Sequence, residues 1–192
     1  LRMVVTSVKD EPSQDQPIKS WFSLVKSFDI VLIIGLLFRA FIMQPYIVEG
    51  NSMEQNFHDK EILIVDKISY KFRQIHRGDT IIFQAPKNPK DDYIKRIIAF
   101  PGETVVIQNG KVSINGKLLD ETYLPKGTQT LTTDKIFRLT LGPDQYLVMG
   151  DNRSNYSDSR EWGFVPFKLI IGESLFVYWP LENMELIKNP YH

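Results

Sequence analysis

The 192-residue chain contains no cysteine, which excludes disulfide bonds, thiolate zinc sites and cysteine nucleophiles together. It also lacks an excess of either charge, because 23 Lys and Arg residues balance 23 Asp and Glu residues. Domains that bind nucleic acid are typically basic, so this balance argues against such a partner. Three dispersed histidines without cysteine do not form a typical zinc site, and we expect neither a metal nor another cofactor.

Apolar residues are plentiful, at 43% of the chain, and they support one domain or one domain with an inserted lobe. Residues 1–20 are polar and of mixed charge, and contain Pro12 and Pro17. This composition is typical of a flexible tail. The tail therefore precedes the structured part of the chain.

The segment 21–43 is centred on an uncharged run at residues 30–38. A membrane-spanning helix needs about 20 mostly apolar residues. The segment reaches that length only by including Lys26, Asp29 and Arg39 towards its ends, where long side chains can extend to the membrane surface. We predict one transmembrane anchor here, and a buried or amphipathic helix is the alternative interpretation.

The basic residues around this segment predict its orientation. Lys9 and Lys19 precede it, whereas the first basic residue after Arg39 is Lys60. Because basic residues favour the cytoplasmic side, the tail is predicted to be cytoplasmic. The chain from residue 44 onward then lies outside a single-pass plasma membrane, with the lipid bilayer as a partner.

From residue 44 the pattern is that of β-strands, and helical periodicity is absent apart from short turns. Two Asn-Gly pairs, at 109–110 and 115–116, are strong hairpin signals. We predict a mainly β fold with an antiparallel folded-sheet or barrel-like catalytic domain over 44–102 and 143–192. Residues 103–142 are predicted to form a smaller inserted β lobe.

Ser52 is a candidate nucleophile, since it follows the apolar segment and precedes the first clear strand. A serine hydroxyl needs a base to remove its proton. His58 lies in a polar turn, His76 in a charged loop, and His192 ends the chain. None has an evident orienting carboxylate, so these three are interpreted as surface histidines.

Lys95 is the other candidate base, and it lies within the apolar strand 93–98. Side chains alternate along a strand, so Lys95 shares a face with Tyr93 and Ile97. If that face is inward, burial lowers the lysine pKa by up to about 3–5 units and makes its amine an effective base. An edge strand with Lys95 in solvent is the alternative, and the pattern alone leaves both open.

Three motifs then appear together, at residues 50–53, at 93–96 with 101–103, and at 150–153 with 158–160. They read Gly-Asn-Ser-Met, Tyr-Ile-Lys-Arg with Pro-Gly-Glu, and Gly-Asp-Asn-Arg with Asp-Ser-Arg. Their order after an apolar segment resembles the catalytic boxes of bacterial type I signal peptidases, in the compact form of Gram-positive bacteria. The last motif is the most specific, and the resemblance covers roughly residues 22–180.

The resemblance implies a serine-lysine mechanism in which Ser52 attacks the scissile carbonyl and Lys95 takes the serine proton. The backbone N–H of Ser52 would help to hold the oxyanion. Supporting roles are implied for Arg96, Asp151, Asp158 and Arg160. The substrate site is implied at Val48, Gly50, Met53, Phe57, Tyr93 and Ile94. These residues suit small side chains at the first and third positions before the cut, and membership of the core is the alternative reading.

The chain departs from the family pattern at three positions. Gly50 offers no side-chain hydroxyl to the oxyanion, and Gln55 stands where the family has a turn proline. Tyr156 occupies the position of a serine that hydrogen-bonds the catalytic lysine. Either the Tyr156 phenol or the neighbouring Ser157 hydroxyl is hypothesised to contact Lys95 instead.

The resemblance implies a membrane-anchored serine endopeptidase that removes signal peptides from exported preproteins. One alternative is a self-cleaving serine-lysine regulator, but the predicted anchor and the absence of a basic helix-turn-helix segment argue against it. Another is a non-catalytic or specialised anchored β domain that binds peptides during assembly of a surface structure. The sequence predicts no oligomeric state.

Overall fold

The computed structural model describes residues 25–36 and 43–191, and the chain divides into two compact units, 1–40 and 41–192. In the first unit, residues 25–36 are helical. Over the described residues, no helix combines the length and hydropathy required to cross a bilayer. The tail and the remaining parts of the expected anchor lie outside the described residues, so the anchor stays a prediction.

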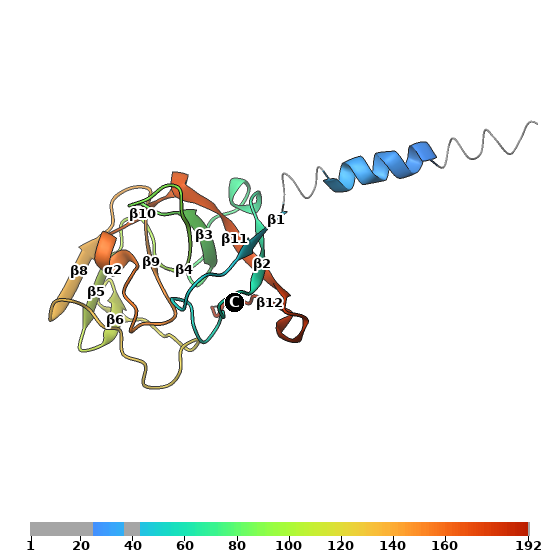
Figure 1. The fold of residues 1–192 in the computed structure, drawn as a ribbon. Coiled ribbons are helices and arrows are strands. Elements are labelled where there is room, and N and C mark those ends of the chain that lie inside the picture. The colour runs from blue at the N-terminus through green and yellow to red at the C-terminus, as the bar shows by residue number, and fades with distance from the viewer. Residues whose placement is uncertain (1–24, 37–42, 192) are drawn as a thin grey trace, which may run out of the picture. The chain divides into compact units, whose positions relative to one another are not determined.

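The second unit is built on antiparallel β-sheets (Figure 1). The larger sheet has the order β1-β2-β11-β3-β4-β9-β10, and β12 pairs with β11. Its strands are β1 Met43–Ile47, β2 Ile62–Asp66, β3 Thr80–Gln84, β4 Asp92–Ala99, β9 Gln145–Met149, β10 Val165–Pro166, β11 Ile170–Trp179 and β12 Glu185–Leu186. The mainly β prediction is confirmed, and the described sheet is an open path with β1 at one end.

A second sheet, of order β7-β6-β5-β8, lies inside the interval expected for the inserted lobe. Its strands are β5 Thr104–Gln108, β6 Lys111–Ile114, β7 Lys117–Leu118 and β8 Ile136–Thr140. Asn109 and Asn115 adopt positive φ, as does the glycine after each, so both expected Asn-Gly turns form. In β8, exposed and partly buried residues alternate, so only one face of this strand packs against the rest of the unit.

The helical elements of this unit are short. They are η1 Ser69–Lys71, η2 Phe167–Leu169, η3 Leu181–Asn183 and α2 Ser159–Trp162. Asp158 caps α2 by accepting a hydrogen bond from the Arg160 backbone N–H. This cap matters for the site because α2 follows directly on the loop that carries the third motif.

The central strand β4 organises the core. It pairs with β3 on one side and β9 on the other, and every residue from Ile94 to Ala99 is buried. Ile98 and Ala99 pack in a cluster with Val105 and Ile107 of the smaller sheet. Both faces of β4 are thus covered, so the polar side chains it carries are removed from water.

Candidate active site

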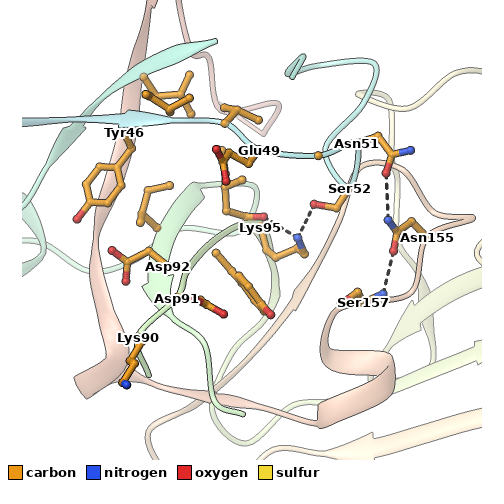
Figure 2. Close-up of a pocket in the computed structure, with 17 residues that line it drawn as sticks. Tyr46, Glu49, Asn51, Ser52, Lys90, Asp91, Asp92, Lys95, Asn155 and Ser157 are labelled. Atoms are coloured by element: carbon orange, nitrogen blue, oxygen red, sulfur yellow. Dashed lines mark hydrogen bonds between the residues drawn. The ribbon is translucent and has the colours of Figure 1, made fainter. Parts of the chain in front are cut away.

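Strand β4 carries Lys95 into the interior, where only 4% of the residue is exposed. The inward interpretation of the strand is therefore correct, and the solvent-edge alternative is not. The Lys95 Nζ atom lies 2.6 Å from Ser52 Oγ and 2.9 Å from the carbonyl oxygen of Ile94 (Figure 2). A serine hydroxyl and an amine at this distance can exchange a proton directly.

Burial controls the protonation of Lys95. Removal from water disfavours the ammonium and lowers the pKa from 10.5 to about 8. The carboxylates of Asp158 and Asp151 act in the opposite direction, and the Arg160 guanidinium adds to the lowering. With a pKa of about 8, roughly one molecule in ten carries the neutral amine at pH 7.

Hydrogen bonds from the 150–152 loop hold the backbone around Ser52. The Asn152 N–H donates to Ser52 O at 3.1 Å, and its side-chain amide donates to Asn51 O at 3.0 Å. A Cβ atom at Gly150 would collide with the Ser52 carbonyl oxygen, so only glycine permits this close approach. Gly150 and Asn152 were part of the third motif, but the sequence assigned them no role.

Two asparagines extend this hydrogen-bond network along the cavity. The Asn155 side-chain amide donates to Asn51 Oδ1 at 3.3 Å, and Asn155 Oδ1 accepts the Ser157 N–H at 3.1 Å (Figure 2). Neither Asn51 nor Asn155 was expected in the site. The available signals were that Asn51 belongs to the first motif and that Asn155 follows the 150–153 motif by two residues.

The four expected support residues form two buried ion pairs. Arg96 Nε donates to Asp151 Oδ1 at 2.8 Å, and Arg160 Nε donates to Asp158 Oδ1 at 2.8 Å. Asp158 Oδ2 also accepts the Gly150 N–H at 3.0 Å. The second ion pair therefore fixes the loop that clamps Ser52.

An open cavity of about 690 Å³ adjoins Ser52 and Lys95. Of the residues expected to bind substrate, Val48, Gly50, Tyr93 and Ile94 line it. Met53 and Phe57 are not among the lining residues, although they share a buried core cluster with the lining residues Val48 and Ile94. The sequence reasoning missed several other lining residues, among them Tyr46, Glu49, Leu63, Ile82, Asp91 and Asp92.

The departures from the family pattern have different structural settings. Gly50 has φ of 86° and Gln55 has φ of 94°, both in the left-handed region. Proline is locked near φ of −65°, so this turn cannot hold a proline at residue 55. Ser157 lines the cavity, whereas Tyr156 is 44% exposed and does not. In the described part of the chain the hydrogen bonds of Lys95 Nζ go to Ser52 Oγ and the Ile94 carbonyl oxygen, so neither hypothesised contact forms in this structure.

The described histidines lie away from the cavity lining. His58 Nδ1 is 3.2 Å from Glu61, and His76 contacts Arg73 at 3.2 Å. The described residues contain no group of three or more His, Asp or Glu side chains that could hold a metal ion. Among the described residues, the titratable side chain that forms a hydrogen bond with Ser52 is that of Lys95 and not of a histidine.

A serine beside a buried amine, at the edge of an open cavity, fits a hydrolase, and comparison with known proteins defines the class. The chain is a serine endopeptidase, because the family model described as "Signal peptidase, peptidase S26" matches residues 21–179. It belongs to this family.

Individual relatives agree with the family assignment. The chain is 35% identical to the probable signal peptidase I-2 of Synechocystis sp., over 96% of this chain and 84% of that protein. It is 38% identical to signal peptidase I S of Bacillus subtilis, over 86% of this chain and 93% of that protein. A crystal structure of a signal peptidase I from Enterococcus faecalis covers 53% of this chain and 97% of its own, at 34% identity and a TM-score of 0.46.

Proposed function

We propose that this protein removes signal peptides from exported preproteins by means of a Ser52–Lys95 dyad. The observation that carries the proposal is the contact of 2.6 Å between Ser52 Oγ and the amine of Lys95, a residue that is 4% exposed. Membership of the signal peptidase family supplies the substrate class. The self-cleaving regulator is set aside, because the relatives that match most of the chain are named signal peptidases.

The geometry supports a two-step reaction. Neutral Lys95 takes the hydroxyl proton of Ser52 as Ser52 Oγ attacks the scissile carbonyl carbon. The resulting oxyanion accepts a hydrogen bond from the Ser52 backbone N–H. The Lys95 ammonium returns the proton to the departing amine, which leaves an ester on Ser52. Lys95 then takes a proton from water, the hydroxide attacks the ester, and the proton returns to Ser52 Oγ. The products are the mature amino terminus and the carboxylate of the signal peptide.

The substrate chain is proposed to lie along β1. This strand is at the end of the larger sheet, and its residues Tyr46 and Ile47 line the cavity together with Val48. A free strand edge can pair with an extended peptide through backbone hydrogen bonds. Apolar lining by Val48 and Ile94 suits small apolar side chains at the first and third positions before the cut.

Cleavage is tested with the full chain in lipid vesicles and a purified signal-peptide-bearing precursor. We expect Ser52→Ala to lower cleavage by about four to six orders of magnitude, because the nucleophile is lost. Ser113→Ala is the matched control, since this serine lies in β6 and donates to Val106 O. Full cleavage by Ser52→Ala refutes the dyad, and an inactive wild-type protein favours the non-catalytic peptide-binding alternative.

We also propose that segment 21–43 anchors the chain once in the cell membrane, with the N-terminus cytoplasmic and the catalytic unit on the outer surface. Exposed apolar side chains on strands β1 and β11 support the proposal that this face of the catalytic unit lies near the bilayer. Ile47 and Trp179 both pair with Ile62, and cross-strand partners share a face. Ile47 is 61% exposed and Trp179 is 49% exposed, so apolar side chains face outward. Tryptophan is enriched at membrane interfaces.

Trp179 provides a test of this membrane contact. The chain has three tryptophans, so Trp21→Phe with Trp162→Phe leaves Trp179 alone. In vesicles of brominated lipid, we expect the fluorescence of this variant to be quenched, because bromine quenches only neighbouring indoles. A variant that retains only Trp162 is the control, since that ring packs 5.9 Å from Phe83. Equal emission from Trp179 in brominated and ordinary lipid contradicts the proposal.

A further inference from the structure

Tyr123 lies in the connection between β7 and β8, in the interval expected for the inserted lobe and outside all three motifs. The Arg96 guanidinium lies 4.5 Å from the centre of its ring, and that of Arg153 lies 5.9 Å away. The Tyr123 hydroxyl accepts from Arg153 at 2.8 Å and donates to Glu121 at 3.0 Å. Its carbonyl oxygen accepts the Asn56 side-chain amide at 3.2 Å.

Each of these contacts leads to a different segment of the active site. Arg96 follows Lys95 on β4 and pairs with Asp151. Arg153 donates to Gly150 O at 3.1 Å, within the loop that clamps Ser52. Asn56 belongs to the turn after Ser52, and its amide also donates to Asp151 at 2.8 Å. Tyr123 thus contacts the nucleophile turn, the lysine strand and the clamping loop.

The charges around Tyr123 explain why an aromatic ring suits this position. Arg96 and Arg153 are buried cations, at 3% and 1% exposure, and both lie near the electron-rich face of the ring. Burial raises the pKa of the Tyr123 phenol, so the hydroxyl keeps its proton for Glu121. An aliphatic side chain could fill the space but would supply neither the ring face nor the hydroxyl.

We propose that Tyr123 is a positioning residue for the peptidase reaction, and that through it the inserted lobe sets the relative placement of Ser52 and Lys95. The inference rests on the proposed dyad. Tyr123 is not among the cavity-lining residues, so its loss should change the chemical step rather than substrate binding. The lobe then contributes to catalysis without touching the substrate.

The test compares Tyr123→Leu with Tyr123→Phe in the full-length protein, by kcat, KM and thermal unfolding. We expect Tyr123→Leu to lower kcat about 10- to 100-fold, because small displacements of reacting groups have effects of this size, with KM unchanged. Tyr123→Phe retains the ring and should restore most of the lost kcat. Ile114→Ala is the control for destabilisation of the lobe, because this residue packs in the core shared by both sheets.

A second variant covers the case in which Tyr123→Leu does not fold. Asn56→Ala removes only the amide that joins the nucleophile turn to Tyr123 O and Asp151, and it should also lower kcat with KM unchanged. Its control is Gln55→Ala, at an exposed neighbour in the same turn.

The inference is wrong if Tyr123→Leu and Asn56→Ala retain wild-type kcat, or if Ile114→Ala lowers kcat equally at matched stability. An inactive wild-type protein, or a fully active Ser52→Ala, instead overturns the proposed dyad. The two failures are therefore distinguishable in one set of measurements.

Discussion

Lys95→Met is expected to lower cleavage about 100- to 10,000-fold, the usual contribution of a general base. Methionine matches the length and apolar stem of lysine but cannot accept the Ser52 proton. Lys95→Arg is the second variant, because a guanidinium stays protonated at every working pH. Precursor cleavage under single-turnover conditions measures both effects. A Lys95→Met protein with wild-type cleavage would show that another group activates Ser52.

The pH dependence identifies the base directly. In the proposed dyad the neutral amine is the active form, so kcat/KM should rise about tenfold per unit below pH 8 and level off above it. A half-maximal rise near pH 6.5, the usual histidine range, would point to a different base. The kcat/KM of the Lys95→Arg variant should not show this rise with pH.

The same burial predicts an effect on stability. Lys95 has a pKa of about 8 in the folded chain and an ordinary pKa of 10.5 when exposed to water, so the unfolded chain binds the proton more strongly. The resulting destabilisation is complete below pH 8 and is relieved as pH rises towards 10.5. Lys95→Met should thus raise the unfolding free energy by about 1 to 3 kcal/mol at pH 7. Urea unfolding at pH 7 and pH 10 measures the expected gain and its decline.

Asp158→Ala is expected to lower the unfolding free energy by about 3 to 5 kcal/mol, because it leaves a buried arginine without its carboxylate. The Asp158 side chain is wholly buried, and that of Arg160 is 1% exposed. The change also removes the acceptor for the Gly150 N–H, so cleavage should fall with stability.

Urea unfolding with Asp134→Ala as the control tests this expectation, since Asp134 is an exposed residue. A second readout is the pH profile. The Asp158 carboxylate raises the pKa of Lys95, so its removal should move the rise in kcat/KM to lower pH. A loss of stability below about 1 kcal/mol would contradict the role assigned to this ion pair.

The smaller sheet, in the interval expected for an inserted lobe, shows where prediction from the sequence was strong and where it failed. Its two Asn-Gly turns were expected, because positive φ at consecutive residues is a local preference of these amino acids. Its link to the active site through Tyr123 was not expected. That link joins Asn56 to a residue 67 positions away, and no local periodicity records such a pairing.

The cavity beside Ser52 shows the same difference between what the sequence predicts and what the folded chain decides. Met53 and Phe57 fit an apolar substrate pocket by sequence, yet both side chains are buried in the core with Val48. Composition alone does not distinguish an apolar residue that lines a substrate pocket from one that packs in the core. Only the packing of β1, β2 and β4 decides which side chains border the open space.

The sequence by itself determined the family, the mainly β class and the two candidate reactive residues. The reason is that motif chemistry, strand alternation and turn preferences are local properties of the chain. The tertiary structure alone decided that both faces of β4 are covered, and hence that Lys95 is buried with a lowered pKa. It also brought Asn152 to Asn51 across 101 positions, which holds Ser52 in place. Desolvation and close approach depend on the packing of distant segments, so they appear only in the folded chain.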